Sequence, residues 1–313
     1  MLLLYSFMPL DKKPILEDNG KAVNGYILSI GEILWDILPS GRKPGGAPAN
    51  FAFHCMQLGA DARLLSRVGN DELGRELIEF YRSLGLSTDF IDTDPTAPTS
   101  TVDVELTADG QPKFTIRENV AWDNIEVTES AVQFAQTADA VCFGSLAART
   151  KTTFQTIQNL VSQTKPSALR VFDVNLREPF VEGGVIKTLL GLANVLKLND
   201  AELTRMASMF NVPGNTVEKH VDWFINQYNL KILIMTCGAQ GSRIFADGKE
   251  YFCQSRSIEV VDTVGAGDAF TATVVVGLLS GWSMNTIHER ANAVAAFVCT
   301  QNGATPKWAP PIH

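Results

Sequence analysis

The sequence has little cationic charge and few cysteines, and each shortage excludes a class of protein. Its 26 Lys and Arg residues are outnumbered by 34 Asp and Glu residues, which gives a formal net charge of −8. Proteins that bind nucleic acid or an anionic membrane usually present a basic face, so we expect neither partner. The five cysteines form no CxxC pair. The sequence therefore predicts no disulfide framework, no zinc site and a reducing, cytoplasmic location.

Long apolar runs and several nucleotide motifs are also missing. No stretch approaches the roughly 18 consecutive apolar residues that span a bilayer, and residues 1–24 lack a basic start and a cleavage site, so we expect an N-terminal tail there. There is no Walker A sequence, no H-R-D or D-F-G set, and no G-x-G-x-x-G after the first apolar run. P-loop, protein-kinase and hydride-transfer architectures are therefore not supported.

The sequence does contain an alternation of short apolar runs and longer helical patterns. The runs are rich in β-branched residues and end at polar residues or glycine, which is typical of buried strands. We therefore expect an α/β fold, a mostly parallel sheet flanked by helices, in one domain over residues 25–313. The expected strands are 26–31, 62–68, 139–144, 169–174, 194–198 and 231–235, and the expected helices are 47–58, 71–84, 150–162, 200–209 and 217–228.

Residues 99–125 break this alternation. They contain two segments of alternating polarity joined by Ala108, Asp109 and Gly110, and glycine supplies the positive φ that a hairpin turn needs. We expect a small β excursion from the α/β body here, completed by residues near 38–43.

The strongest chemical signal is a glycine-rich turn that opens an apolar helix. A strand is expected at 257–261, before Gly265, Ala266 and Gly267. Glycines let the backbone approach a ligand closely, and the free amides at a helix start attract an anion. Asp268 would repel that anion unless it has chemical work, so we interpret it as a general base that accepts a proton during phosphoryl transfer. The alternative is an ordinary acidic residue in a first helical turn.

A second glycine turn lies near the start of the chain. Gly45 and Gly46 precede a helix and again allow close backbone approach, while Asn50 and Asp36 can bond hydroxyl groups. These residues could equally be ordinary turn and loop formers.

Two long segments give the sequence a family resemblance. DTVGAGDAF at 262–270 resembles the C-terminal signature of the ribokinase-like (PfkB) carbohydrate kinases, and GGAPANFA at 45–52 resembles their N-terminal sugar-site signature. The resemblance extends through GEILWD, SRVGNDELG, DVNLR, NDAE and TCGAQGS, and so covers nearly the whole chain from Tyr26. It implies an enzyme that uses ATP and Mg²⁺ to phosphorylate a sugar.

The resemblance also assigns residues. It implies that Asp36, Gly45, Gly46 and Asn50 hold the sugar beneath a lid at 99–125, and that Gly265, Ala266, Gly267 and Asp268 form the catalytic turn. Arg177 can offer its planar fork to phosphate oxygens beside the substrate. The nucleotide side comprises Asn175, Asn199, Glu202, Thr236, Gly238, Gly241, Gly267 and Asn292. Glu202 would organise Mg²⁺ through water, although Asn199 and Glu202 also fit a capping box. Asp262 matches a monovalent-cation position, which predicts stimulation by K⁺.

The acceptor is less well defined than the family. The motifs GE-x-LWD, FTIRENVAWD and GSLAAR most resemble fructokinases, which implies D-fructose; ribose or 2-keto-3-deoxygluconate is the alternative acceptor. A kinase-fold scaffold without chemistry is the alternative of another class, but its expected losses, at Asp268 or the glycines, have not occurred. An exposed edge of the lid hairpin would pair with a second copy, which predicts a homodimer.

Overall fold

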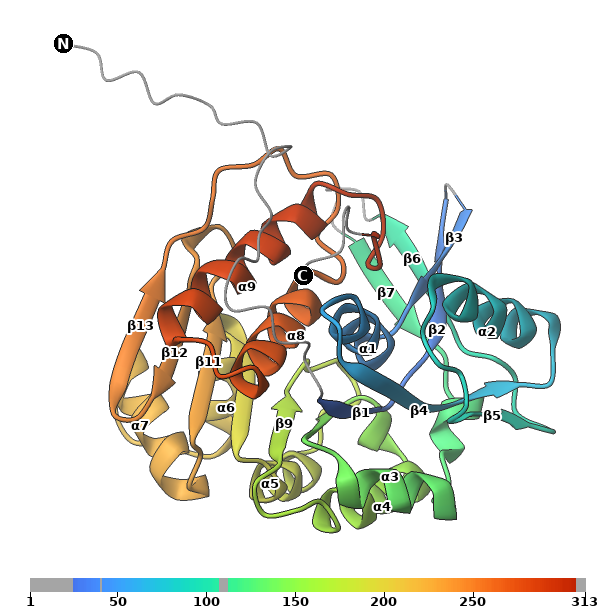
Figure 1. The fold of residues 1–313 in the computed structure, drawn as a ribbon, viewed down its shortest axis with the longest axis horizontal. Coiled ribbons are helices and arrows are strands. Elements are labelled where there is room, and N and C mark those ends of the chain that lie inside the picture. Colours follow the sequence, from blue (N-terminus) through green and yellow to red (C-terminus); the bar gives the residue numbers. More distant parts are fainter. Residues whose placement is uncertain (1–24, 40, 107–111, 308–313) are drawn as a thin grey trace.

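A large, mostly parallel sheet runs through the molecule (Figure 1). The computed structural model describes residues 25–39, 41–106 and 112–307; the predicted tail and the turn at Ala108–Gly110 lie outside them. The strand order is β13-β12-β11-β10-β9-β8-β1-β4-β5, and only β12 runs against its neighbours. The strands are β1 Tyr26–Ile30, β4 Asp61–Gly69, β5 Ile91–Asp94, β8 Ala140–Gly144, β9 Leu169–Asp173, β10 Val195–Asn199, β11 Ile232–Thr236, β12 Ser242–Ala246 and β13 Lys249–Cys253.

Helices cover both faces of this sheet, which confirms the predicted fold class. Alternate strand residues face opposite sides: Leu28 belongs to one buried cluster and Ile27 to the other. Helices α3 to α7 pack on the first face, and α1, α2, α8 and α9 pack on the second. The helices are α1 Ala47–Gln57, α2 Glu72–Leu84, α3 Glu129–Thr137, α4 Lys151–Ser162, α5 Gly183–Leu192, α6 Asp200–Met209, α7 Val217–Tyr228, α8 Ala266–Leu279 and α9 Met284–Cys299.

The chain changes direction across the sheet between β1 and β8. From β1 it adds β4 and β5 on one side, and it then returns to add β8, β9, β10 and β11 in order on the other. Connections that leave neighbouring strands in opposite directions open a crevice at the carboxyl ends of those strands. The topology therefore places a ligand site after β1 and β8.

A second sheet stands beside the first, in the order β3-β2-β6-β7 (Figure 1). Its strands are β2 Leu34–Leu38, β3 Gly41–Gly45, β6 Thr101–Leu106 and β7 Pro112–Ile116. The β6–β7 pair is antiparallel, as expected of a hairpin, and β2 and β3 join it as predicted for residues near 38–43. We call these four strands the β lid.

The end of the segment that we assigned to the lid belongs to the main body instead. Trp122 is fully buried in the core below the sheet. The Arg149 guanidinium lies 4.0 Å from the Trp122 ring centroid and 4.5 Å from that of Phe180, and its Nε donates to Asp123 Oδ1 at 2.7 Å. Aromatic and ionic contacts thus anchor residues 120–125 to the body.

The strand predicted at 257–261 is wrong. Residues 254–261 have no regular secondary structure, and the side chains of Val260 and Val261 are 57% and 56% exposed. The Val261 amide bonds to the Cys299 carbonyl and not to a neighbouring strand. A β-branched run predicts a strand only where the sheet offers it an edge.

Candidate active site

The glycine-rich turn opens α8, and we call residues 262–268 the anion loop. Gly265 caps the helix with a φ of 81°, and a Cβ at this position would lie 2.6 Å from the Ala304 Cβ. Only glycine fits there without displacing the neighbouring backbone. The amides of Ala266, Gly267 and Asp268 stand in the first turn, where an α-helix leaves them without helical acceptors, although the Ala266 amide makes a long bond of 3.4 Å to the Thr263 carbonyl. The loop thus presents several amides at the positive end of a helix that is buried over 269–277.

Asp268 follows this turn and is held from the other glycine motif. Its Oδ2 accepts a hydrogen bond of 2.9 Å from Asn50 Nδ2 on α1, a residue 218 positions away. Burial, with the nearby Asp173 carboxylate, raises the pKa of Asp268 to about 6. A carboxylate with this pKa is ionised at neutral pH and is a stronger base than an ordinary aspartate. The last residue of the anion loop is therefore a buried carboxylate with a raised pKa, which is the property that a general base at this position requires.

Lys197 is a buried cation that the sequence analysis missed. It lies inside β10, and its Nζ donates to Asp173 Oδ1 at 2.9 Å. A Cβ added at Gly267 would be 3.3 Å from that Nζ, so the ammonium lies next to the anion loop. Its charge lowers the pKa of Asp268 against the opposing effect of burial. The sequence signal that could have identified this residue is a lysine between the apolar residues of a buried strand.

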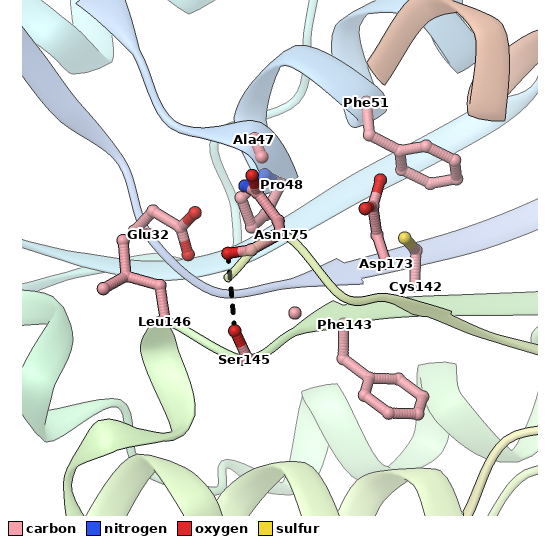
Figure 2. Close-up of a pocket in the computed structure, with 11 residues that line it drawn as sticks. Glu32, Ala47, Pro48, Phe51, Cys142, Phe143, Ser145, Leu146, Asp173 and Asn175 are labelled. Atoms are coloured by element: carbon pink, nitrogen blue, oxygen red, sulfur yellow. Dashed lines mark hydrogen bonds between the residues drawn. The ribbon is translucent and has the colours of Figure 1, made fainter. Parts of the chain in front are cut away.

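A pocket lies at the predicted crevice between β1 and β8 (Figure 2). Glu32, Ser145, Asp173 and Asn175 contribute polar groups, and Ser145 Oγ donates to the Asn175 carbonyl at 3.4 Å. Glu32, also missed, is 3% exposed, and burial raises its pKa to about 7. Its Oε2 is buried without a protein partner. Buried polar atoms usually have a hydrogen-bond partner, so this oxygen is available to a donor group of a ligand in the pocket.

The residues predicted to hold the sugar converge on the same end of the sheet. A Cβ at Gly46 would come within 2.4 Å of the Glu32 carbonyl oxygen, so the backbone packing there requires glycine. A Cβ at Gly45 would lie 2.4 Å from Asp36 Oδ2 and would displace that side chain. Burial and the charge of Asp262 raise the pKa of Asp36 to about 6. Asn50 Oδ1 is buried without a partner, so both Asn50 and Glu32 present an unused acceptor.

Arg177 lies at the mouth of this site. It is exposed, and its charge lowers the pKa values of Glu32, Asp36 and Asp268. Its Nη1 donates only to the adjacent Leu176 carbonyl, at 3.1 Å, among the contacts of the described residues. Most of the guanidinium fork is thus available to an anion.

The predicted nucleotide residues gather at the ends of β10 and β11, which pair through Asn199 and Thr236. Asn199 and Glu202 form a reciprocal capping box: Asn199 Oδ1 accepts from the Glu202 amide, and Glu202 Oε2 accepts from the Asn199 amide, both at 2.8 Å. Glu202 Oε1 also accepts from the Leu176 amide at 2.9 Å. The capping interpretation is therefore confirmed, and Glu202 ties the start of α6 to the segment beside Asn175.

The turn after β11 brings the remaining predicted nucleotide residues together. Gly238 and Gly241 have φ values of 53° and 109°, and a Cβ at Gly241 would lie 2.1 Å from the Cys253 carbonyl oxygen. Asn292 lies behind this turn, in the interior. Its Nδ2 donates to Ser242 Oγ and to the His288 carbonyl, each at 2.9 Å. Its amide group is therefore engaged with protein groups, and its partner Ser242 pairs with Thr236 at the end of β11.

Asp262, the predicted monovalent-cation residue, is occupied by protein donors. Its Oδ2 accepts from Lys43 Nζ at 3.1 Å and from the Gly303 amide at 3.2 Å, while its Oδ1 accepts from the Val264 amide at 3.1 Å. Among the residues that the structure describes, no group of three or more His, Cys, Asp or Glu side chains is arranged to hold a metal ion. No helix in this part of the chain is long and apolar enough to cross a membrane.

The sheet topology, the pocket at its switch point and the anion loop define the protein as one of the ribokinase-like α/β class. The structure of a ribokinase II from E. coli matches it with a TM-score of 0.77 over 90% of this chain and 94% of that chain, at 20% identity. At that identity the match shows the fold alone.

The chain belongs to the pfkB family of carbohydrate kinases, whose model matches residues 40–310. The sugar kinase PH1459 of Pyrococcus horikoshii is 29% identical over 309 residues, which cover 92% of this chain and 94% of that protein. Its structure aligns with a TM-score of 0.76 over 89% of this chain and 93% of that chain, and it has also been solved with ATP. Fructokinase-2 of Solanum habrochaites is 27% identical over 314 residues, 92% of this chain and 94% of that protein. The protein is thus a sugar kinase.

Proposed function

We propose that this sugar kinase transfers the γ-phosphoryl group of ATP to D-fructose and forms fructose 6-phosphate, with Asp268 as the general base. One observation carries the mechanism: the Asn50–Asp268 hydrogen bond joins the sugar motif to the anion loop and leaves Asn50 Oδ1 buried and unpaired. A sugar hydroxyl bound to that oxygen lies beside both the base and the loop amides.

The chemical step requires little beyond this arrangement. The attacking hydroxyl oxygen forms the new bond to phosphorus as the bond to the ADP oxygen breaks, and its proton passes to the Asp268 carboxylate. The amides of Ala266, Gly267 and Asp268 stabilise the charge on the transferring group. The β lid, which carries Asp36, closes over the sugar and excludes water as a competing acceptor.

The nucleotide lies along the ends of β10 and β11, with its phosphates directed to the anion loop. Asn199, Thr236, Gly238 and Gly241 line this path, and the exposed Arg177 can bond phosphate oxygens. Each Glu202 oxygen accepts one amide hydrogen bond, which leaves lone pairs for a water held by Mg²⁺. When bound, Mg²⁺ neutralises phosphate charge. The ATP complex of PH1459 supports this nucleotide.

Fructose is favoured by the fructokinase relative. The five cysteines are free, in keeping with a cytoplasmic enzyme. The edges of the β lid, β3 and β7, would pair with a second copy in a homodimer. Sedimentation at micromolar concentrations tests this assembly, and a monomer throughout would contradict it.

An ADP-release assay tests the reaction. Mg-ATP is supplied with fructose, ribose, glucose, 2-keto-3-deoxygluconate, adenosine or fructose 6-phosphate in turn, with Asp268→Asn as the control for chemistry. We expect strong turnover on fructose that the variant lacks. Preferred turnover on another acceptor would keep the mechanism and overturn the sugar, and no turnover on any acceptor would overturn both.

Asp36→Ala separates the two ends of the site. The lost carboxylate bonds hydroxyls of the sugar, so we expect the KM for the sugar to rise about tenfold or more while the KM for ATP stays unchanged. Steady-state kinetics with each substrate varied in turn measures both constants. An effect confined to ATP would reverse the assignment of the two ends.

A further inference from the structure

Lys43 links the β lid to the anion loop. It lies on β3, and its Nζ donates to Asp262 Oδ2 at 3.1 Å and to Asn302 Oδ1 at 2.9 Å. Its stem lies alongside Gly303, where an added Cβ would be 3.8 Å from Lys43 Cδ. The Lys43 and Asp262 side chains are 31% and 19% exposed, so this ion pair is partly shielded from solvent. It is the described ion pair between the lid and the segment that starts α8.

The Asp262 carboxylate already accepts several hydrogen bonds from the protein. It accepts the Val264 amide within the loop and the Gly303 amide from the segment after α9, and the Val261 and Asp262 amides both bond to the Cys299 carbonyl. A K⁺ ion at this carboxylate would have to share it with the Lys43 ammonium, an ion of similar size and the same charge. The residues present therefore do not fit a K⁺ site centred on Asp262.

We propose that the Lys43 ammonium is the built-in monovalent cation of this kinase, which holds the anion loop through Asp262 in place of a bound K⁺. This inference rests on the proposed function only for its activity readout. It makes Lys43 a positioning residue, because the ammonium acts on the loop and not on the reacting atoms.

The same side chain couples the two substrates. Lys43 pairs with Asp36 across the β2–β3 ladder, and Asp36 is the lid carboxylate proposed to bind the sugar. The charges of Asp262 and Lys43 act on Asp36 in opposite directions. Because Asp36 and Lys43 are paired on adjacent strands, a shift of the lid that moves Asp36 also moves the Lys43 ammonium relative to Asp262.

The test compares cations and variants. ADP release by wild type, Lys43→Met and Arg42→Met is measured in KCl, NH₄Cl or choline chloride at one ionic strength of about 0.15 M, so that screening is constant. Arg42, the neighbour of Lys43 on β3, pairs with Glu76 and serves as the matched control. We expect wild type and Arg42→Met to be insensitive to the cation. Lys43→Met should lose about five- to tenfold in kcat/KM in choline, and K⁺ or NH₄⁺ should restore part of it.

A second readout does not depend on turnover. Hydrogen exchange of the Val264 and Gly303 amides should accelerate in Lys43→Met, and K⁺ should reverse the change, whereas wild type and Arg42→Met should exchange slowly in every salt. Strong stimulation of wild type by K⁺ would overturn the proposal, as would unchanged exchange and kinetics in Lys43→Met. If no sugar is phosphorylated by wild type, the proposed function fails, while the exchange result still decides the role of Lys43.

Discussion

Two acidic residues occupy the same position in two helices of this kinase and do different things. Glu202 and Asp268 are each the third residue of their helices, α6 and α8. Glu202 turns back to the amide of its N-cap Asn199 and also accepts the Leu176 amide. Asp268 follows the N-cap Gly265, which has no side chain to share a capping box, and reaches across to Asn50.

The difference shows that one helix position can either complete a capping box or hold a buried carboxylate whose pKa is raised. Two backbone amides stabilise the charge of Glu202 within the protein. Asp268 is buried with a single described side-chain donor, so its pKa is raised to about 6 and it retains affinity for a proton. The glycine cap of α8 has no side chain to accept from the Gly267 and Asp268 amides, which leaves them for a ligand, while the Asn199 cap accepts from the Glu202 amide in α6.

The comparison is tested most strongly at Asp268. Asp268→Asn removes the proton acceptor, so we expect turnover to fall by roughly two to four orders of magnitude while ATP binding, measured by calorimetry, persists. Because folding raises the pKa of the Asp268 carboxyl, its ionisation lowers the free energy of unfolding of the protein as the pH rises through about 6. The variant should therefore melt no lower than wild type at neutral pH. Turnover like that of wild type would refute the base.

Gly265→Ala tests whether α8 tolerates a side chain at its cap. The new Cβ would meet Ala304 and would require a φ of 81°. We expect a stability loss of about 1–3 kcal/mol from the backbone strain and, as the loop amides shift, a fall in turnover of about tenfold or more. The matched control is Gly281→Ala, with a φ of 70° and open space around the added Cβ. Equal losses of turnover in both variants would show that strain alone matters.

Lys197 and Asp173 should move the pH profile in opposite directions. Asp268 must be ionised to act, so log kcat/KM should fall as the pH drops below about 6. Lys197→Met removes a cation and should move this limb up by about one pH unit; Asp173→Asn removes an anion and should move it down. Lys197→Arg, which keeps the charge, should stay close to wild type. A thermal melt identifies variants that fail to fold. If the acidic limb of the kcat/KM profile lay at the same pH in wild type and in all folded variants, Lys197 and Asp173 would not control the pKa of Asp268.

Glu202→Gln should give the smallest effect on rate and a clear effect on stability. The new amide nitrogen cannot accept a hydrogen bond, so either the Asn199 or the Leu176 amide loses its partner, at a cost of about 1–3 kcal/mol. We also expect a higher Mg²⁺ requirement in the ADP-release assay. Glu129→Gln, at an exposed first-turn position of α3, is the control for a simple loss of charge. A melting temperature unchanged in Glu202→Gln would contradict the capping box.

Local sequence rules predicted the parts of the site that depend on the backbone. Glycine turns at 45–46 and 265–267, together with the alternation of strands and helices, predicted the sheet and the two loops that meet at Asp268. Lys197 and Glu32 were not predicted, because their importance comes from burial beside groups far away in sequence. The same limit explains 257–261, where the β-branched run is followed by a backbone contact to the Cys299 carbonyl, far away in sequence, and not by pairing with a strand. It also explains Lys43, whose partner Asp262 lies 219 residues further on.

The long reach of the Asn50–Asp268 contact has a consequence for how the chain folds. Helix α1 is buried over Pro48–Cys55, and α8, which packs against it, is made after all the described strands of both sheets. A ribosome that adds about 5–20 residues per second leaves α1 without its contacts to α8 for on the order of 10–40 s. During that interval the nascent chain holds an apolar helix that only the sheet can cover, and Asp268 is not yet present to accept the hydrogen bond from Asn50. Chaperones that shield apolar surface have their main opportunity to act on this protein in that interval.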